Sequence, residues 1–192
     1  MSKGRLEAFS DGVLAIIITI MVLELKVPEG NSWQSLKPLI PKFLAYLFSF
    51  LYIGIYWNNH HHLFQAVKKI NGKILWANLH LLFWLSLMPF ATDWIGETHF
   101  AKNPVATYGF GLVLCAIAYN ILENTITKYE DENSKLKQAI ASRFKENVSI
   151  VLYVSGIIIS FVYPYIAVVF YYTVAVLWLI PDKRIEKTLN EN

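Results

Sequence analysis

Two groups of polar side chains in this 192-residue sequence have types that could do chemistry, and both lie beside long apolar runs. One is the triplet His60-His61-His62, which suggests a metal site. Consecutive residues on a helix point about 100° apart, so three adjacent imidazoles cannot converge on one ion. We therefore expect no structural metal site here. One histidine should be a buried polar partner, and the other two should lie at the membrane edge.

The other group is Ser10-Asp11, which directly precedes an uncharged run over residues 12–23 that is followed by Glu24. This run is shorter than the ~20 residues that span a bilayer, so the helix reaches membrane thickness only by including acidic residues. Ionisable groups at membrane depth usually face the interior of a helix bundle or water. The first apolar helix is therefore the one expected to line a polar path.

A helical projection divides this segment into two faces. One face is an aliphatic stripe about 100° wide with a single hydroxyl, and its members are Gly12, Ile16, Thr19, Ile20 and Leu23. Ser10 and Asp11 fall on the opposite side. Periodicity alone favours a packing or lipid-facing role for such a stripe, because aliphatic stripes are common on helices.

The composition excludes most soluble classes of protein. Hydrophobic residues make up 55% of the chain and charged residues 16%, with a mean hydropathy of +0.40, whereas a soluble domain has about 25% charged residues. The net charge of +3 is small and no basic stripe accompanies it, so nucleic acid is not an expected partner. The sequence has no nucleophile–base pair, phosphate loop or H-E-x-x-H pattern, so we do not expect an enzyme.

We predict an all-α integral membrane protein with six transmembrane helices in a single domain over residues 1–192. The predicted spans cover about residues 9–25, 43–64, 74–92, 105–122, 148–163 and 165–180. Residues 149–180 are uncharged and would form one helix about 48 Å long, too long for a hydrocarbon core ~30 Å thick. The break at Pro164 therefore indicates a hairpin. Residues 123–147 are expected to form a polar helical stretch outside the hydrocarbon, within which residues 128–146 carry both charge signs and are expected to be a solvated face.

The basic residues orient this arrangement. Thirteen of the 17 Lys and Arg residues fall on one side of six spans, and the other four are Lys26, Lys37, Lys42 and Lys102. Cytoplasmic loops carry an excess of Lys and Arg, so we expect both termini in the cytosol. Merging the last two spans would place Lys183, Arg184 and Lys187 outside, so six spans fit the charge distribution better.

Three local patterns point to one family. Arg5, Phe9, Ser10 and Asp11 form an R-x-x-x-F-S-D pattern that resembles the signature of the transmembrane-protein-175 family of potassium channels. Trp57-x-x-His60 with Leu63-Phe64 resembles the W-x-x-H…L-F pattern of that family. Asn78 with Met88-Pro89 resembles its N…L-P pattern, in which Met88 replaces Leu. Members of the family are lysosomal in animals and also occur in bacteria and archaea.

The resemblance implies a potassium channel that is weakly selective over sodium. Because R-x-x-x-F-S-D occurs once, the chain looks like the single-unit bacterial type, a homotetramer in the cell inner membrane with the first helix of each copy lining a central pore. In the family, aliphatic residues on that helix form a hydrophobic constriction. The positions that match here are Ile16, Ile20 and Leu23, with Thr19 as the hydroxyl. Potassium is the permeant ion, and no cofactor is implied.

The resemblance also assigns a place to the polar group. Ser10 and Asp11 point away from the pore axis, where Trp57, His60 and Asn78 are candidate partners on the second and third helices. We expect this network, with Arg5 and Phe9, to anchor the first helix, and we expect a buried Asp11 to pair with a partner such as His60. The alternative is a secondary transporter or proton-coupled carrier that uses the buried Asp/His network, although no internal repeat supports it.

Overall fold

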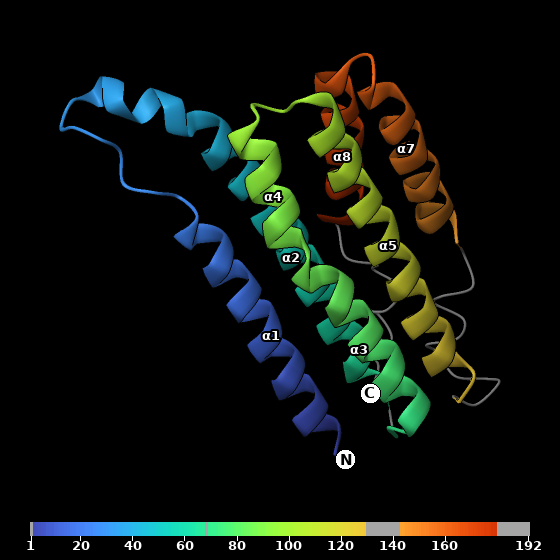
Figure 1. Ribbon diagram of the computed structural model, residues 1–192. Helices are drawn as coiled ribbons and strands as arrows, with labels where there is room; N and C mark the ends of the chain where they lie inside the picture. Colours follow the sequence, from blue (N-terminus) through green and yellow to red (C-terminus); the bar gives the residue numbers. More distant parts are fainter. Residues whose placement is uncertain (1, 68, 130–142, 180–192) are drawn as a thin grey trace.

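The computed structural model describes residues 2–67, 69–129 and 143–179, and these residues form helices and no strands (Figure 1). The bounds of the helices are α1 Lys3–Leu23, η1 Trp33–Leu39, α2 Ile40–Gln65, α3 Gly72–Ser86, α4 Met88–Glu97, α5 Lys102–Thr127, α7 Phe144–Ser160 and α8 Pro164–Leu179. The predicted all-α class is therefore confirmed. Figure 1 shows the long helices running side by side, with α1 at one edge and the α7–α8 pair at the other.

Four helical stretches in the described ranges are long and apolar enough to cross a membrane: Lys3–Leu23, Trp33–Gln65, Gly72–Glu97 and Lys102–Thr127. The third stretch joins α3 and α4, which are separated only at Leu87, next to Pro89. Proline lacks an amide hydrogen and interrupts a helix at this point. The predicted third span therefore extends to Glu97, and the predicted fourth span is longer at both ends.

The last two predicted spans form a hairpin, as expected. The helix α7 has 17 residues and α8 has 16, and α8 begins at Pro164. Tyr171 of α8 occupies the space over two glycines, Gly156 of α7 and Gly109 of α5, so these three helices pack closely. A Cβ atom at Gly109 would lie 2.0 Å from the Tyr171 hydroxyl, and one at Gly156 would lie 2.5 Å from its Cε1. Only glycine at these two positions leaves room for the ring.

Both ends of the polar stretch over residues 123–147 are helical, as expected, but the expectation of a solvated face over residues 128–146 is wrong at Glu146. Residues 123–127 belong to α5 and residues 144–147 to α7, and Glu123 and Glu146 are buried. Helix packing against α5 and α7 removes these carboxylates from water, although their charge signs alone indicated exposure. The middle of the stretch, residues 130–142, lies outside the described residues.

The helix α1 packs through one face only. Its buried residues are Leu6, Ser10, Leu14, Ile17 and Met21, which recur at helical spacing. Its main contacts are with α2, α3 and α4. Beyond Leu23 the chain leaves the bundle and returns through η1 to α2 (Figure 1). One whole side of α1 therefore remains uncovered by its own chain.

Candidate functional site

A buried hydrogen-bond cluster joins α1, α2 and α3. The Ser10 hydroxyl donates to the carbonyl of Leu6 at 2.9 Å and accepts from Nδ2 of Asn78 at 2.9 Å. Oδ1 of Asn78 lies 2.7 Å from Nε2 of His60. Because Asn78 uses its amide nitrogen toward Ser10, its oxygen is the acceptor and Nε2 of His60 carries the proton. All three residues are at most 3% exposed, so the cluster is a dry anchor between helices.

Asp11 lies outside this cluster, which corrects the expectation that it is buried against His60. Its Oδ1 accepts a hydrogen bond from Nε1 of Trp57 at 3.0 Å, in an exposed position. The reason is geometric, since consecutive helical residues diverge by about 100° and Ser10 already points toward α3. The motif therefore places one residue in the interior and its neighbour at the surface of the chain.

Arg5 and Phe9 also lie outside the cluster. Both are exposed, and Arg5 forms no hydrogen bond or ion pair with the described residues. Both share the uncovered side of α1 with the aliphatic stripe. Within the described ranges Arg5 therefore has no polar contact with the expected intrachain network, and its exposed position agrees with the other orientation that its helical angle permits.

The histidine triplet divides as predicted. His60 is buried, while His61 is exposed, stacks on Trp57 and lies 2.8 Å from the side-chain amide of Gln65. His62 is half-buried. The three rings therefore have different surroundings, and within the described ranges no three His, Cys, Asp or Glu side chains come together as a possible metal site.

The aliphatic stripe of α1 faces away from its own bundle. Ile16, Ile20 and Leu23 are 59%, 43% and 73% exposed, and Thr19 is also exposed. The hydroxyl of Thr19 donates to the carbonyl of Ala15 at 2.8 Å, so its oxygen keeps acceptor capacity toward the outside of the helix. Four predicted residues thus share one uncovered face, opposite the buried anchor at Ser10.

A second polar cluster was missed by sequence reasoning. Thr92 of α4 donates at 2.6 Å to the hydroxyl of Ser49 in α2, which lies 2.9 Å from the hydroxyl of Tyr108 in α5. All three side chains are buried. Ser49 and Thr92 each carry a hydroxyl group within an apolar span. Because buried polar groups are nearly always hydrogen-bonded, these two residues could have been predicted to share a partner.

The far end of α1 lies beside a charged group on α2 and α4. Lys42 pairs with Glu97 and has its Nζ 3.6 Å from Oδ1 of Asp93. A shallow pocket next to Lys42 and Asp93 is also lined by Glu24. This end of α1 thus lies beside three carboxylates and the ammonium group of Lys42, and the charge of Lys26 also acts on Glu97.

A family model described as the endosomal/lysosomal potassium channel TMEM175 matches residues 5–89 of the chain. The matched segment contains the buried anchor, the aliphatic stripe and the Trp57–Asp11 contact. It ends at Pro89, the residue that follows the break between α3 and α4.

Similarity to individual proteins extends over the whole chain. A protein named as a potassium channel from Chryseobacterium sp. (strain P1-3) is 76% identical over 192 residues, covering 100% of both chains. A potassium channel of Streptomyces collinus (strain DSM 40733 / Tue 365) is 37% identical over 128 residues, 62% of each chain. The crystal structure of a lysosomal potassium-selective channel TMEM175 homologue from Chamaesiphon minutus superposes with a TM-score of 0.82 at 28% identity. This match covers 94% of this chain and 97% of that one.

Proposed function

Because this chain belongs to the TMEM175 family of potassium channels, we propose that it conducts potassium ions across the bacterial inner membrane through a pore lined by α1. The proteins it resembles are ion channels and not enzymes. The observation that carries the assignment of α1 is its uncovered stripe, which is aliphatic apart from one hydroxyl.

We propose that four copies surround the pore axis. A single chain places α1 at the edge of its bundle, so one copy cannot enclose a path along the exposed face (Figure 1). Closed cyclic symmetry repeats one face around an axis and brings four identical stripes together. The exposed stripe supports this arrangement, because no other part of the described chain covers it.

The constriction in this proposal is a stack of aliphatic rings from Ile16, Ile20 and Leu23. Ile16 and Leu23 lie about 10 Å apart along the helix axis. A narrow apolar ring closes a pore sterically or by dewetting. Potassium gives up hydration water more readily than sodium, so such a ring favours potassium weakly, and the oxygens of four Thr19 hydroxyls offset part of the lost hydration.

The cluster of Ser10, Asn78 and His60 has a mechanical role in this proposal. It holds α1 to α2 and α3 in a single rotational position. A rotation of α1 by one residue would take Ser10 out of the cluster and turn the stripe by about 100°. The anchor therefore sets which side chains face the axis without touching the ion.

The topology follows from the charge distribution. The chain is a multi-pass membrane protein, and we place both termini in the cytosol because most Lys and Arg residues then lie on the cytosolic side. The charged group formed by Lys42, Asp93, Glu97 and Glu24 then lies at the outer end of α1. Its excess of carboxylates attracts cations to the outer mouth.

The decisive test is the reversal potential of purified protein in liposomes under bi-ionic potassium and sodium. We expect Ile16→Asn to raise unitary conductance and to bring the sodium-to-potassium permeability ratio closer to one, because a polar side chain wets the ring. The matched control is Val176→Asn, since Val176 is 61% exposed on α8 and distant in sequence from the stripe. Discrete unitary openings are expected in the parent protein, and a slow saturable flux would indicate a carrier instead.

Unchanged conductance and selectivity in both Ile16→Asn and Leu23→Ala would contradict the hydrophobic constriction. Equal effects of Ile16→Asn and Val176→Asn would also contradict it, because Val176 lies on α8 and outside the proposed constriction. In either case the assignment as a potassium channel would still stand, with its constriction at other residues.

A further inference from the structure

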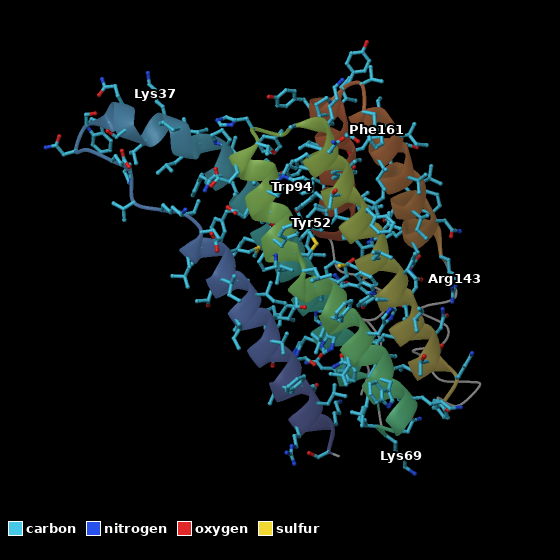
Figure 2. All side chains as sticks on the ribbon, viewed as in Figure 1. Lys37, Tyr52, Lys69, Trp94, Arg143 and Phe161 are labelled. Carbon is cyan, nitrogen blue, oxygen red and sulfur yellow. The ribbon has the colours of Figure 1, made fainter. Side chains whose placement is uncertain are left out.

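A separate cavity lies on the opposite side of the bundle from α1, between α2, α5, α7 and α8. It has a volume of about 490 Å³ when the solvent space at its open mouth is included, so its enclosed part holds only a small group. Five aromatic rings line it: Tyr52, Tyr56, Tyr119, Tyr153 and Trp178. Figure 2 shows Tyr52 well inside the bundle and Arg143 near the start of α7. Such an aromatic enclosure is a recurrent design for binding organic cations.

One carboxylate lines this aromatic cavity. Glu146 is only 9% exposed, and its Oε2 is buried and makes no hydrogen bond with any described residue. A buried carboxylate oxygen that makes no hydrogen bond is costly, because a partner is needed to offset the loss of hydration of its charge. A positively charged group bound in this cavity can therefore pair with the Glu146 carboxylate beside the aromatic wall.

Two amides add acceptors to the same wall. Nδ2 of Asn59 donates to the carbonyl of Ile55, and Nδ2 of Asn120 donates to the carbonyl of Ala116, each at 2.9 Å. The side-chain oxygens of both residues are thereby left as acceptors. The polar side of the cavity thus accepts hydrogen bonds, which matches a ligand that carries several N–H donors.

The ring of Trp178 already attracts a cation. Nζ of Lys145 lies 5.6 Å from the centroid of this ring, and Nε1 of Trp178 donates to Ser149 at 2.9 Å, which fixes the ring in place. Lys145 is not among the residues that line the cavity. The indole is therefore held by α7 as a rigid wall.

We propose that this cavity binds a primary ammonium group of about the size of ethanolamine, with Glu146 as its counter-ion, the Asn59 and Asn120 oxygens as acceptors and the aromatic rings around its carbon atoms. Cation–π attraction and a desolvated carboxylate act on the same charge here. A bare metal ion fits less well, because Glu146 is the only carboxylate among the described lining residues and the aromatic rings offer no ligand atoms for it. The ammonium group belongs either to a free amine or to the headgroup of phosphatidylethanolamine. The site does not depend on the pore proposed above.

The test is equilibrium dialysis of radiolabelled ethanolamine against the full-length protein in nanodiscs of phosphatidylglycerol, a lipid without an ammonium group. We expect saturable binding that Glu146→Gln weakens by about tenfold or more, the loss typical of a hydrogen bond to a charged group. Tyr56→Leu should weaken binding as well, since it removes one ring of the wall. The control Glu29→Gln removes the same charge from an exposed loop and should change nothing.

Two further measurements distinguish a lipid headgroup from a free amine as the bound ligand. In nanodiscs that contain phosphatidylethanolamine, native mass spectrometry should detect retained lipid on the parent protein and less on Glu146→Gln if the headgroup is the ligand. Retention equal in both proteins, together with free-ethanolamine binding that depends on Glu146, assigns the site to a free amine.

Three results would overturn the proposal: no saturable ethanolamine binding together with no lipid retention, unchanged binding in both Glu146→Gln and Tyr56→Leu, or displacement of ethanolamine by equimolar potassium chloride. Choline binding as tight as ethanolamine would also contradict a primary ammonium, because a quaternary group has no N–H to donate. Size-exclusion chromatography of each variant identifies misfolded protein, and Tyr56→Leu provides an independent test if Glu146→Gln does not fold.

Discussion

At the residue scale, neighbours within one motif have opposite environments. Ser10 is fully buried and bonded to Asn78, while Asp11 is exposed and bonded to Trp57. The energetic consequences differ accordingly, because an unpaired group costs more in a dry interior than at a surface. Substitutions in the Ser10–Asn78 contact should therefore lower the stability more than substitutions of Asp11.

We expect Asn78→Ala to destabilise the protein by about 1–3 kcal/mol, because it leaves the Nε2–H of His60 unsatisfied in the interior. Asp11→Asn should cost less than about 1 kcal/mol, because the lost interaction is exposed and water replaces it. Thermal unfolding monitored by size-exclusion chromatography in detergent measures both values. A larger loss in Asp11→Asn than in Asn78→Ala would show that Asp11 is buried by another copy of the chain.

At the element scale, the packing of α5, α7 and α8 depends on two positions that have no side chain, Gly109 and Gly156. The ring of Tyr171 occupies the space over Gly109 of α5 and Gly156 of α7, and a Cβ atom at either glycine would overlap it. Small residues allow helices to approach closely in membranes, where no hydrophobic force draws them together. This packing also positions Glu146 and Trp178 on the wall of the aromatic cavity.

We expect Gly109→Ala to destabilise the fold by about 1–3 kcal/mol, the usual cost of overpacking a core. The matched control is Gly111→Ala on the same helix, where the nearest atom to a new Cβ is Sδ of Met88 at 3.3 Å, the flexible part of a side chain. Chemical unfolding of both variants tests this difference. Equal stability of the two variants would contradict the close approach of Tyr171.

At the scale of the whole molecule, α1 makes contacts on one face and leaves the other open. The adjoining segment also exposes large apolar side chains, with Val27 at 90% and Trp33 at 86% exposure. Exposed apolar surface of this kind marks contacts with lipid or with another protein chain. A single copy thus leaves the exposed stripe of α1 and the segment around residues 27–33 without protein partners among the described residues.

We expect native mass spectrometry from lipid nanodiscs to show a tetramer as the dominant species, because four stripes close around one axis. Potassium flux into liposomes should rise with the tetramer fraction across preparations. A stable monomer or dimer, with no larger species in lipid, would contradict the proposed assembly while leaving the fold unchanged.

The sequence by itself determined the membrane class, the hairpin at Pro164 and the exposed stripe of α1. These features follow from local composition, from a rigid proline and from the 3.6-residue period, none of which needs information on distant residues. Sequence reasoning also identified Ser10, His60 and Asn78 as partners, through patterns that resemble a known family.

Only the tertiary structure decided which polar groups are buried away from water. Asp11 and Glu146 are both acidic residues within apolar helices, yet Asp11 is exposed and Glu146 is buried. The same holds for Ser49, Thr92 and Tyr108, whose cluster joins three helices distant in sequence. Burial depends on which helices pack around a side chain, and that packing is set by contacts among residues far apart along the chain.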